Sequence, residues 1–475
     1  MSKSLTTAQD EAAAPAMPSV RWVLAGLSLS MLLSSLGTSI ANVALPTMAQ
    51  AFGATFQDVQ WIVLAYLLAI TTLIVSVGRL GDIVGRRRLL LGGLVLFTAA
   101  SVLCGLAPTL GLLIAARAAQ GLGAAVMMAL TMAFVGETVP KAKTGRAMGL
   151  LGAMSALGTA LGPSLGGLLI AGPGWQAIFL INAPLGLLAL LLASRHLPAD
   201  RQRSQVERPG FDVMGTALLA LTLAAYALAM TLGRGSFGLL NIVLLAAAIV
   251  GLGLFLRVEA KAASPLIRLA MLRDRLLGAS LVTSALVATV MMTTLVVGPF
   301  YLARGLGLDA VLVGLIMTVG PAMVALSGVP AGRLADRFGA ERMTLAGLVA
   351  IAGGSFALAA MPTAFGIPGY VAALVVVTVG YAQFQTANNS AVMRDVPQDR
   401  RGVISGMLNL SRNLGLVTGA SVMGAVFAVA SATADITTAP PEAIATGMRV
   451  TFFVAGLLSV GALVIANRAA KHLKT

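Results

Sequence analysis

The chain has 475 residues, of which 58% are hydrophobic and only 10% are charged, and its mean hydropathy is +0.93. A soluble globular chain carries about 25% charged residues, so this composition excludes a soluble enzyme, a disordered protein and a disulfide scaffold. The net charge of +15 would indicate nucleic-acid binding in a soluble protein. In a membrane protein it reflects basic cytoplasmic loops, so we expect no nucleic-acid partner.

Residues 1–20 are predicted to form a cytoplasmic tail, because they contain no apolar core before a cleavage site. Apolar stretches of membrane-spanning length then recur to the end of the chain. Helices satisfy every backbone polar group in lipid, so the sequence predicts an all-α polytopic membrane protein. Fourteen transmembrane helices are expected near residues 22–45, 57–78, 89–107, 110–136, 145–171, 175–194, 211–232, 237–257, 276–302, 310–332, 343–361, 366–391, 402–431 and 448–467.

The basic residues fall on alternate connections between these spans. If the N-terminus is cytoplasmic, only Arg234, Arg304 and Arg449 lie in connections on the opposite side, and Arg117 and Arg412 lie within spans. All other Lys and Arg residues are then cytoplasmic, as expected from the positive-inside rule. The pattern predicts a multi-pass protein of the cell (inner) membrane with both termini in the cytoplasm.

An internal repeat relates the two ends of this series of spans. GRLGDIVG at 78–85 reappears as GRLADRFG at 332–339, and a second matched block follows in each half. The repeat predicts an N-terminal six-helix bundle (21–200), a linker with two extra helices (201–275) and a C-terminal six-helix bundle (276–475). Pseudo-symmetric halves of this kind are typical of transporters that bind their substrate near the membrane midplane.

The repeated loop is a candidate gating element. Its glycines allow tight turns and close helix approach, and its carboxylate can accept hydrogen bonds from a neighbouring helix N-terminus. The alternative is an ordinary positively charged loop. The predicted latch residues are Gly78, Asp82, Gly85, Arg86, Gly332, Asp336 and Gly339.

The fourth span contains a charged residue. Arg117 lies about two turns into the span, and Gln120 lies on the same face one turn later. A guanidinium inside the membrane is costly, so it is a functional candidate by default. The alternative is that Arg117 reaches back to the nearby outer interface.

The fifth span combines a glycine stripe with a proline. Gly158, Gly162 and Gly166 recur every four residues, and Pro163 lies mid-span. Such a stripe allows close helix packing, and the proline favours a bend. The simple interpretation is tight packing; the sharper one is a bent helix between the bundles that controls opening.

Other polar residues within spans are candidates for a substrate cavity, although each could instead make a helix–helix hydrogen bond. They are Asn42, Tyr66, Asn182, Gln385, Asn388, Asn389, Arg412 and Asn413. The single cysteine cannot form an intrachain disulfide, and the two histidines lie in polar flanks. We therefore expect neither a metal site nor a cofactor.

Together these motifs resemble the major facilitator superfamily, and within it the fourteen-span drug:proton antiporters. GRLGDIVGRRR (78–88) is similar to the signature between spans two and three, RAAQGLGAA (117–125) to that of span four, and GTALGPSLGG (158–167) to the antiporter signature. The resemblance implies multidrug efflux of small lipophilic compounds by alternating access. It also implies that Asp82 latches the bundles, near Gly402 by the repeat, and that Arg117 takes part in proton coupling.

One position departs from this resemblance. Family members often carry an acidic residue in the first span, where this chain has Gly37. Without a carboxylate there, the cavity is expected to favour neutral, zwitterionic or anionic compounds over dications. The alternatives are a dedicated exporter of one metabolite and a membrane enzyme or sensor. An enzyme would need paired intramembrane catalytic groups and a sensor would need a sizeable soluble domain, and the sequence shows neither, so we expect a transporter. A monomer is one state that is compatible with this sequence.

Overall fold

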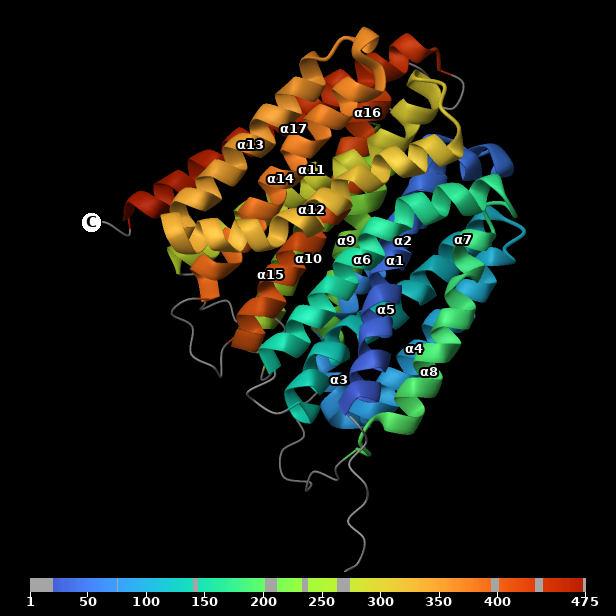
Figure 1. Cartoon of the computed structure of the whole chain (residues 1–475), viewed down its shortest axis with the longest axis vertical. Helices are drawn as coiled ribbons and strands as arrows, with labels where there is room; N and C mark the ends of the chain where they lie inside the picture. The colour runs from blue at the N-terminus through green and yellow to red at the C-terminus, as the bar shows by residue number, and fades with distance from the viewer. Residues whose placement is uncertain are drawn as a thin grey trace, which may run out of the picture.

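The computed structural model describes residues 20–74, 76–139, 144–200, 212–232, 238–262, 274–393, 401–431 and 439–472. The predicted tail 1–20 thus lies outside the described residues except for Val20. Within the described part, fourteen helices are long and apolar enough to cross a membrane, as the sequence predicts. The fold is entirely helical in this part of the chain, and the spans pack side by side (Figure 1).

The N-terminal bundle contains the first six spans, with α7 and α8 together making the sixth. A short helix, α3, lies in the loop after the second span. The helices are α1 (Val20–Phe52), α2 (Phe56–Leu73), α3 (Val77–Val84), α4 (Arg86–Gly105), α5 (Leu110–Thr138), α6 (Thr144–Ala171), α7 (Ala177–Leu180) and α8 (Asn182–His196).

The linker supplies two spans and the C-terminal bundle supplies six. Short π-helical segments extend two of these spans, η3 (Tyr301–Gly305) after α11 and η5 (Gly419–Met423) between α15 and α16. The helices are α9 (Val213–Thr231), α10 (Leu239–Lys261), α11 (Arg275–Phe300), α12 (Ala310–Phe338), α13 (Ala340–Ala360), α14 (Gly366–Met393), α15 (Arg401–Thr418), α16 (Gly424–Ala430) and α17 (Pro441–His472).

Span boundaries differ from the predictions mainly where hydropathy gives no signal. The second helix ends at Leu73 rather than near residue 78, and a separate short helix, α3, begins at Val77. The last helix begins at Pro441, seven residues before its apolar run, because proline fits the first turn of a helix. The polar first turn of that helix does not register in a hydropathy average.

Among the described residues, the two bundles share a hydrophobic core at one end and not at the other. Since fourteen spans return the chain to its starting side, we call the side holding Val20 and His472 the terminal side and the opposite one the far side. One buried cluster joins both bundles through the far-side halves of α1, α2, α11 and α12, with Phe56, Phe300 and Phe427 among its members. Two other clusters, on the terminal side, each contain residues of a single bundle.

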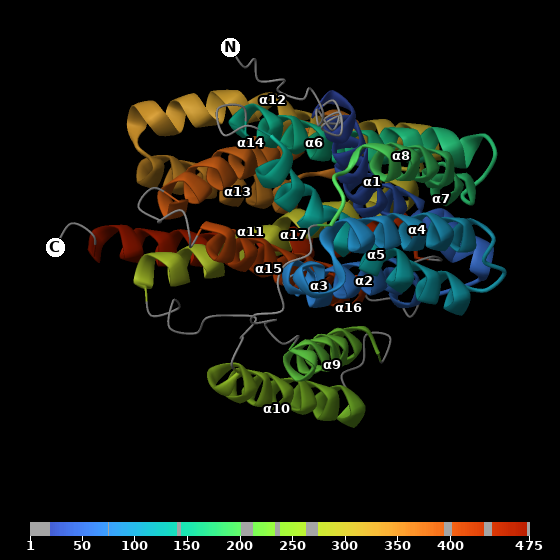
Figure 2. The ribbon, with the colours of Figure 1, turned by 90° about the horizontal axis from the view of Figure 1, so that it is seen from below.

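The inserted helices lie outside both bundles. Figure 2 shows α9 and α10 together on one side of the body. The inner helix, α9, packs against α2 and η5, and α10 packs against α9. The linker spans therefore add to the fold without entering the space between the bundles.

Candidate functional site

A fully buried arginine forms the centre of the candidate site. Arg117 on α5 donates from Nε to the carbonyl of Ile62 at 2.9 Å and from Nη1 to the carbonyl of Gly37 at 3.1 Å. Its guanidinium also lies over the ring of Tyr66, 4.1 Å from the centroid. Arg117 is 0% exposed, so it does not reach back to the membrane interface. The side chain instead ties α5 to α1 and α2.

Gln120 extends this network to a fourth helix. Its carbonyl oxygen accepts a hydrogen bond from Nη1 of Arg117, and its Nε2 donates to the hydroxyl of Ser101 on α4 at 2.7 Å. Tyr66 completes the cluster by donating to the carbonyl of Ser34 at 2.8 Å. The structure thus brings together Arg117 and Gln120, which were predicted to act in transport, and Tyr66, which was predicted to line the substrate cavity.

No carboxylate of the described residues belongs to this cluster. The described residues contribute no salt bridge to Arg117, and its Nη2 is buried without a hydrogen-bond partner. A Cβ placed on Gly37 would lie 3.1 Å from the Tyr66 hydroxyl and 3.4 Å from the ring of Phe97. Gly37, where an acid was expected from the family resemblance, therefore lies directly beside the unbalanced positive charge.

The other predicted cavity residues do not gather at one place. Asn42 is buried and donates to a carbonyl of its own helix, and Asn182 is buried and donates to the carbonyl of Ile178 in α7. The side-chain oxygens of both residues are buried and unpaired. Asn388 is also buried and donates to Ser284 of α11 at 3.1 Å. On the C-terminal bundle, Asn389 is exposed, Asn413 is buried, and Gln385 and Arg412 are half-buried.

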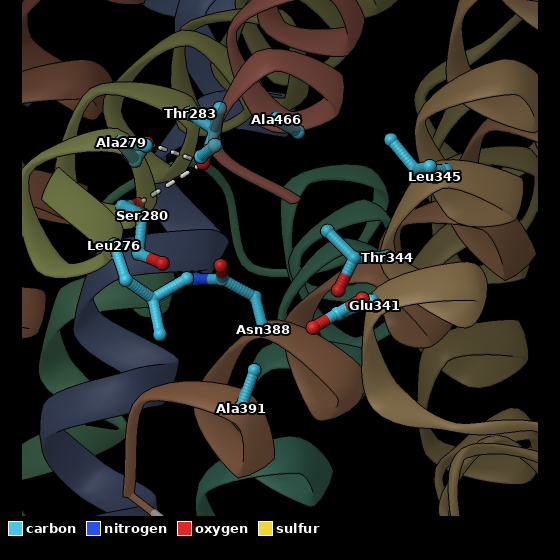
Figure 3. A pocket seen from close by; sticks show the side chains of 11 residues that line it. Leu276, Ala279, Ser280, Thr283, Glu341, Thr344, Leu345, Asn388, Ala391 and Ala466 are labelled. Atoms are coloured by element: carbon cyan, nitrogen blue, oxygen red, sulfur yellow. Dashed lines mark hydrogen bonds between the residues drawn. The ribbon is translucent and has the colours of Figure 1, made fainter. Parts of the chain in front are cut away.

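Asn388 lines a separate pocket on the terminal side of the C-terminal bundle. Figure 3 shows Glu341 and Thr344 of α13 facing Asn388 and Ser280 across this pocket. The cavity measures about 30 Å³, which is room for roughly two water molecules. It is too small for a lipophilic substrate and lies away from the Arg117 cluster.

The predicted glycine stripe packs within one bundle. A Cβ on Gly158, Gly162 or Gly166 would meet atoms of α1, so these glycines hold α6 against α1. The contact between the bundles instead uses Gly167 of α6, next to Ala310 and Gly314 of α12. Pro163 is buried in α6, and its carbonyl faces Gly314. The sequence analysis missed Gly167 and Gly314, although the pair Gly166–Gly167 was a visible signal.

Polar and aromatic contacts complete the far-side closure. Gln60 on α2 donates from Nε2 to the carbonyl of Ala420 in η5 at 2.9 Å. The ring of Phe56 lies 4.7 Å from that of Phe300 and 5.5 Å from that of Phe427, centroid to centroid. Both contacts cross between the bundles and hold them together on the far side.

The predicted latch loop has a partner that the sequence analysis did not identify. Asp82 forms an ion pair with Arg86 at 3.0 Å. A different carboxylate, that of Asp200, lies at the N-terminus of α4, where it accepts hydrogen bonds from the backbone N–H groups of Arg87 (2.8 Å) and Arg88 (3.2 Å). Gly85 adopts φ 104° beside this carboxylate, and a Cβ there would collide with it. Asp200 therefore caps α4.

The second copy of the loop has the same backbone turn. Gly339 adopts φ 91° before α13, as Gly85 does before α4. Asp336 is exposed, while Gly78 is exposed and Gly332 half-buried. The environment of Gly402, predicted to face Asp82, lies outside the residues whose side chains are described. The latch thus stays a prediction.

Comparison with known proteins identifies the family. The sequence profile of the Major Facilitator Superfamily matches residues 27–420. The multidrug resistance protein Stp of Mycobacterium tuberculosis is 34% identical, over 86% of this chain and 75% of its own. The riboflavin transporter RibZ of Clostridioides difficile is 31% identical, over 86% and 88%. A solved bacterial homologue of the lysosomal transporter Spinster has the same fold, with a TM-score of 0.69 over 95% of this chain and 97% of its own at 15% identity. The chain belongs to the major facilitator superfamily and is a multi-pass membrane transporter.

Proposed function

We propose that the protein is a secondary active exporter of small lipophilic compounds, working by alternating access and driven by proton influx. The observation that carries this proposal is the one-sided closure, in which the bundles share a core on the far side and have separate cores on the terminal side. Rocking the two rigid bundles about this contact would exchange the open side. The positive-inside pattern supports a cytoplasmic terminal side, so this conformation would face inward in the cell membrane.

Arg117 is the proposed coupling residue. It contacts backbone carbonyls of α1 and α2, so a change in its hydrogen bonds would move helices that also meet the C-terminal bundle. Its buried charge has no carboxylate beside it in the described residues. We therefore expect neutral, zwitterionic or anionic lipophilic substrates to be favoured over dications, since a second cation would be repelled.

Reconstitution tests both parts of the proposal. Proteoliposomes with a pH-sensitive dye inside are given a panel of neutral, anionic, monocationic and dicationic lipophilic compounds, with protein-free liposomes as the control. Proton movement that requires both protein and compound is the expected result. No movement with any compound contradicts proton antiport, and efficient export of a dicationic dye contradicts the charge preference.

A dedicated exporter of one metabolite is the second candidate. The named riboflavin transporter among the relatives favours it as much as the multidrug proteins favour the first. In the same assay, transport of a single compound out of the panel would identify it.

The latch proposal has its own test. Asp82 lies near the end of α3 and pairs with Arg86 at the start of α4, and its neutral variant Asp82→Asn keeps the side-chain shape. We expect Asp82→Asn to slow export in the reconstituted assay, with Asp336→Asn as the matched change in the second repeat. Normal transport by Asp82→Asn rules out the latch.

A further inference from the structure

The two bundles meet along two seams that run from one side of the membrane to the other. One seam lies between α2 and the pair α15–η5, and the other lies between α6 and α12. In a structure closed only on the far side, each seam is a potential lateral opening on the terminal side. The two seams have different surroundings.

The first seam is covered along its length by α9. The indole of Trp61 donates to Thr231 at 3.1 Å, and the hydroxyls of Ser76 and Thr216 lie 3.1 Å apart, so both ends of α9 are tied to the N-terminal bundle. Between these ends, the hydroxyl of Tyr226 donates to Thr418 of α15 at 3.2 Å. The linker helix therefore bridges both bundles.

Apolar packing fills the same seam. Leu219 and Leu223 on α9 are each 6% exposed and lie against Leu68 of α2 and Leu414 of α15, and Phe255 of α10 backs them at 2% exposed. Leu68 also packs against the shared far-side core, so the apolar packing beneath α9 continues from that core along the seam. This seam is closed to lipid by α9 itself.

The second seam is sealed only on the far side. There the backbones of α6 and α12 touch at Gly167 and Gly314. Toward the terminal side the two helices diverge (Figure 1), and a Cβ added at Gly149 or Gly152 of α6 or at Gly328 of α12 would meet no atom within 4 Å. Among the described helices, none packs over this seam as α9 does over the other.

We propose that apolar substrates enter the space between the bundles from the bilayer, through the α6–α12 seam on the terminal side, and that α9 closes the other seam to them. This inference rests on the proposed export of lipophilic compounds. Such compounds concentrate in the bilayer because each buried CH₂ contributes about 0.8 kcal/mol. A lateral entrance lets them pass from lipid to the cavity without returning to water.

Lipid access to the interior can be measured without a transported substrate. Asn389 is exposed on α14 and lies one turn beyond Thr386. The methyl group of Thr386 faces α12, because a Cβ placed on Gly332 of α12 would lie 4.0 Å from it. It therefore lies beside the open half of α12. A bimane fluorophore is attached to Asn389→Cys in a Cys104→Ser background, and its quenching by doxyl-labelled phosphatidylcholine is recorded in nanodiscs. Bimane at Val250→Cys, 61% exposed on α10, gives the reference for full lipid contact.

We expect quenching at position 389 to reach at least half of the reference value. Filling the open seam with Gly152→Phe and Gly328→Phe should reduce it several-fold, because both sites have room for a side chain and the fold is retained. The matched change on the other side, Leu219→Ala with Leu223→Ala, should leave it unchanged. The proposal is overturned if bimane at position 389 is not quenched. It is also overturned if the two phenylalanine substitutions leave the quenching unchanged while the two alanine substitutions increase it. A failure of the export proposal would appear only in the proteoliposome assay and would leave these values unaltered.

Discussion

The backbone contact between Gly314 and Gly167 sets how tightly the far side closes. A methyl group on Gly314 would overlap the carbonyl oxygen of Pro163 and lie 3.0 Å from Cα of Gly167. Carbon atoms pack at about 3.5–4.0 Å, so Gly314→Ala requires α6 and α12 to separate by roughly 0.5–1 Å. Overpacking of this kind costs about 1–3 kcal/mol. Because the strain is relieved when the far side opens, the closed state should lose about 5- to 150-fold in relative population.

Pulsed electron paramagnetic resonance between the bundles measures this shift. Spin labels at Gln50→Cys, at the far-side end of α1, and Phe365→Cys, between α13 and α14, report the far-side distance in a Cys104→Ser background. Gly328→Ala is the matched control, since it lies on the same helix and its methyl would meet no atom within 4 Å. The expected result is a longer-distance population in Gly314→Ala only. Identical distance distributions for the two alanine variants would refute the reasoning.

Three further changes test the site. Gly37→Asp places a carboxylate beside Arg117 and Tyr66 and should raise export of a monocationic dye relative to a neutral one in proteoliposomes; an unchanged ratio argues against charge selection. Arg117→Lys keeps the positive charge, but a lysine cannot donate to acceptors on two helices at once. Proton-coupled export should therefore fall at least about tenfold while the protein stays folded, and wild-type rates would show that Arg117 has no role in coupling. Asp200→Ala removes the cap of α4 and should cost about 1 kcal/mol, seen as a lower melting temperature than that of Asp336→Ala, a change at an exposed acid; equal values would contradict the cap.

The spans were predictable because lipid imposes a local requirement. Each span must be long, apolar and helical whatever its neighbours are, so composition within the span is enough to find it. The repeated glycine turns at Gly85 and Gly339 were likewise visible, since a positive φ before a helix favours glycine wherever it occurs.

Pairings between distant residues were not predictable. Arg117 contacts Gly37 across 80 residues, and Asp200 caps α4 across 113. No local pattern distinguishes Asp200 from other acids in polar connections. The glycine stripe shows the same limit, because its spacing indicates close packing but not whether α1 or α12 is the partner.

The fourteen spans could be read from the chain alone, because hydropathy is a property of residues within one span. The two related halves were predicted from motifs that recur along the chain, and recognising a recurrence requires no knowledge of how the helices pack. Three features of the described residues could not be read from the chain: the bundles close on one side, Arg117 is buried with no carboxylate beside it, and α9 lies over one seam and not over the other. Those features depend on which helix faces meet, and in lipid many apolar faces are equivalent until small residues and hydrogen bonds select one.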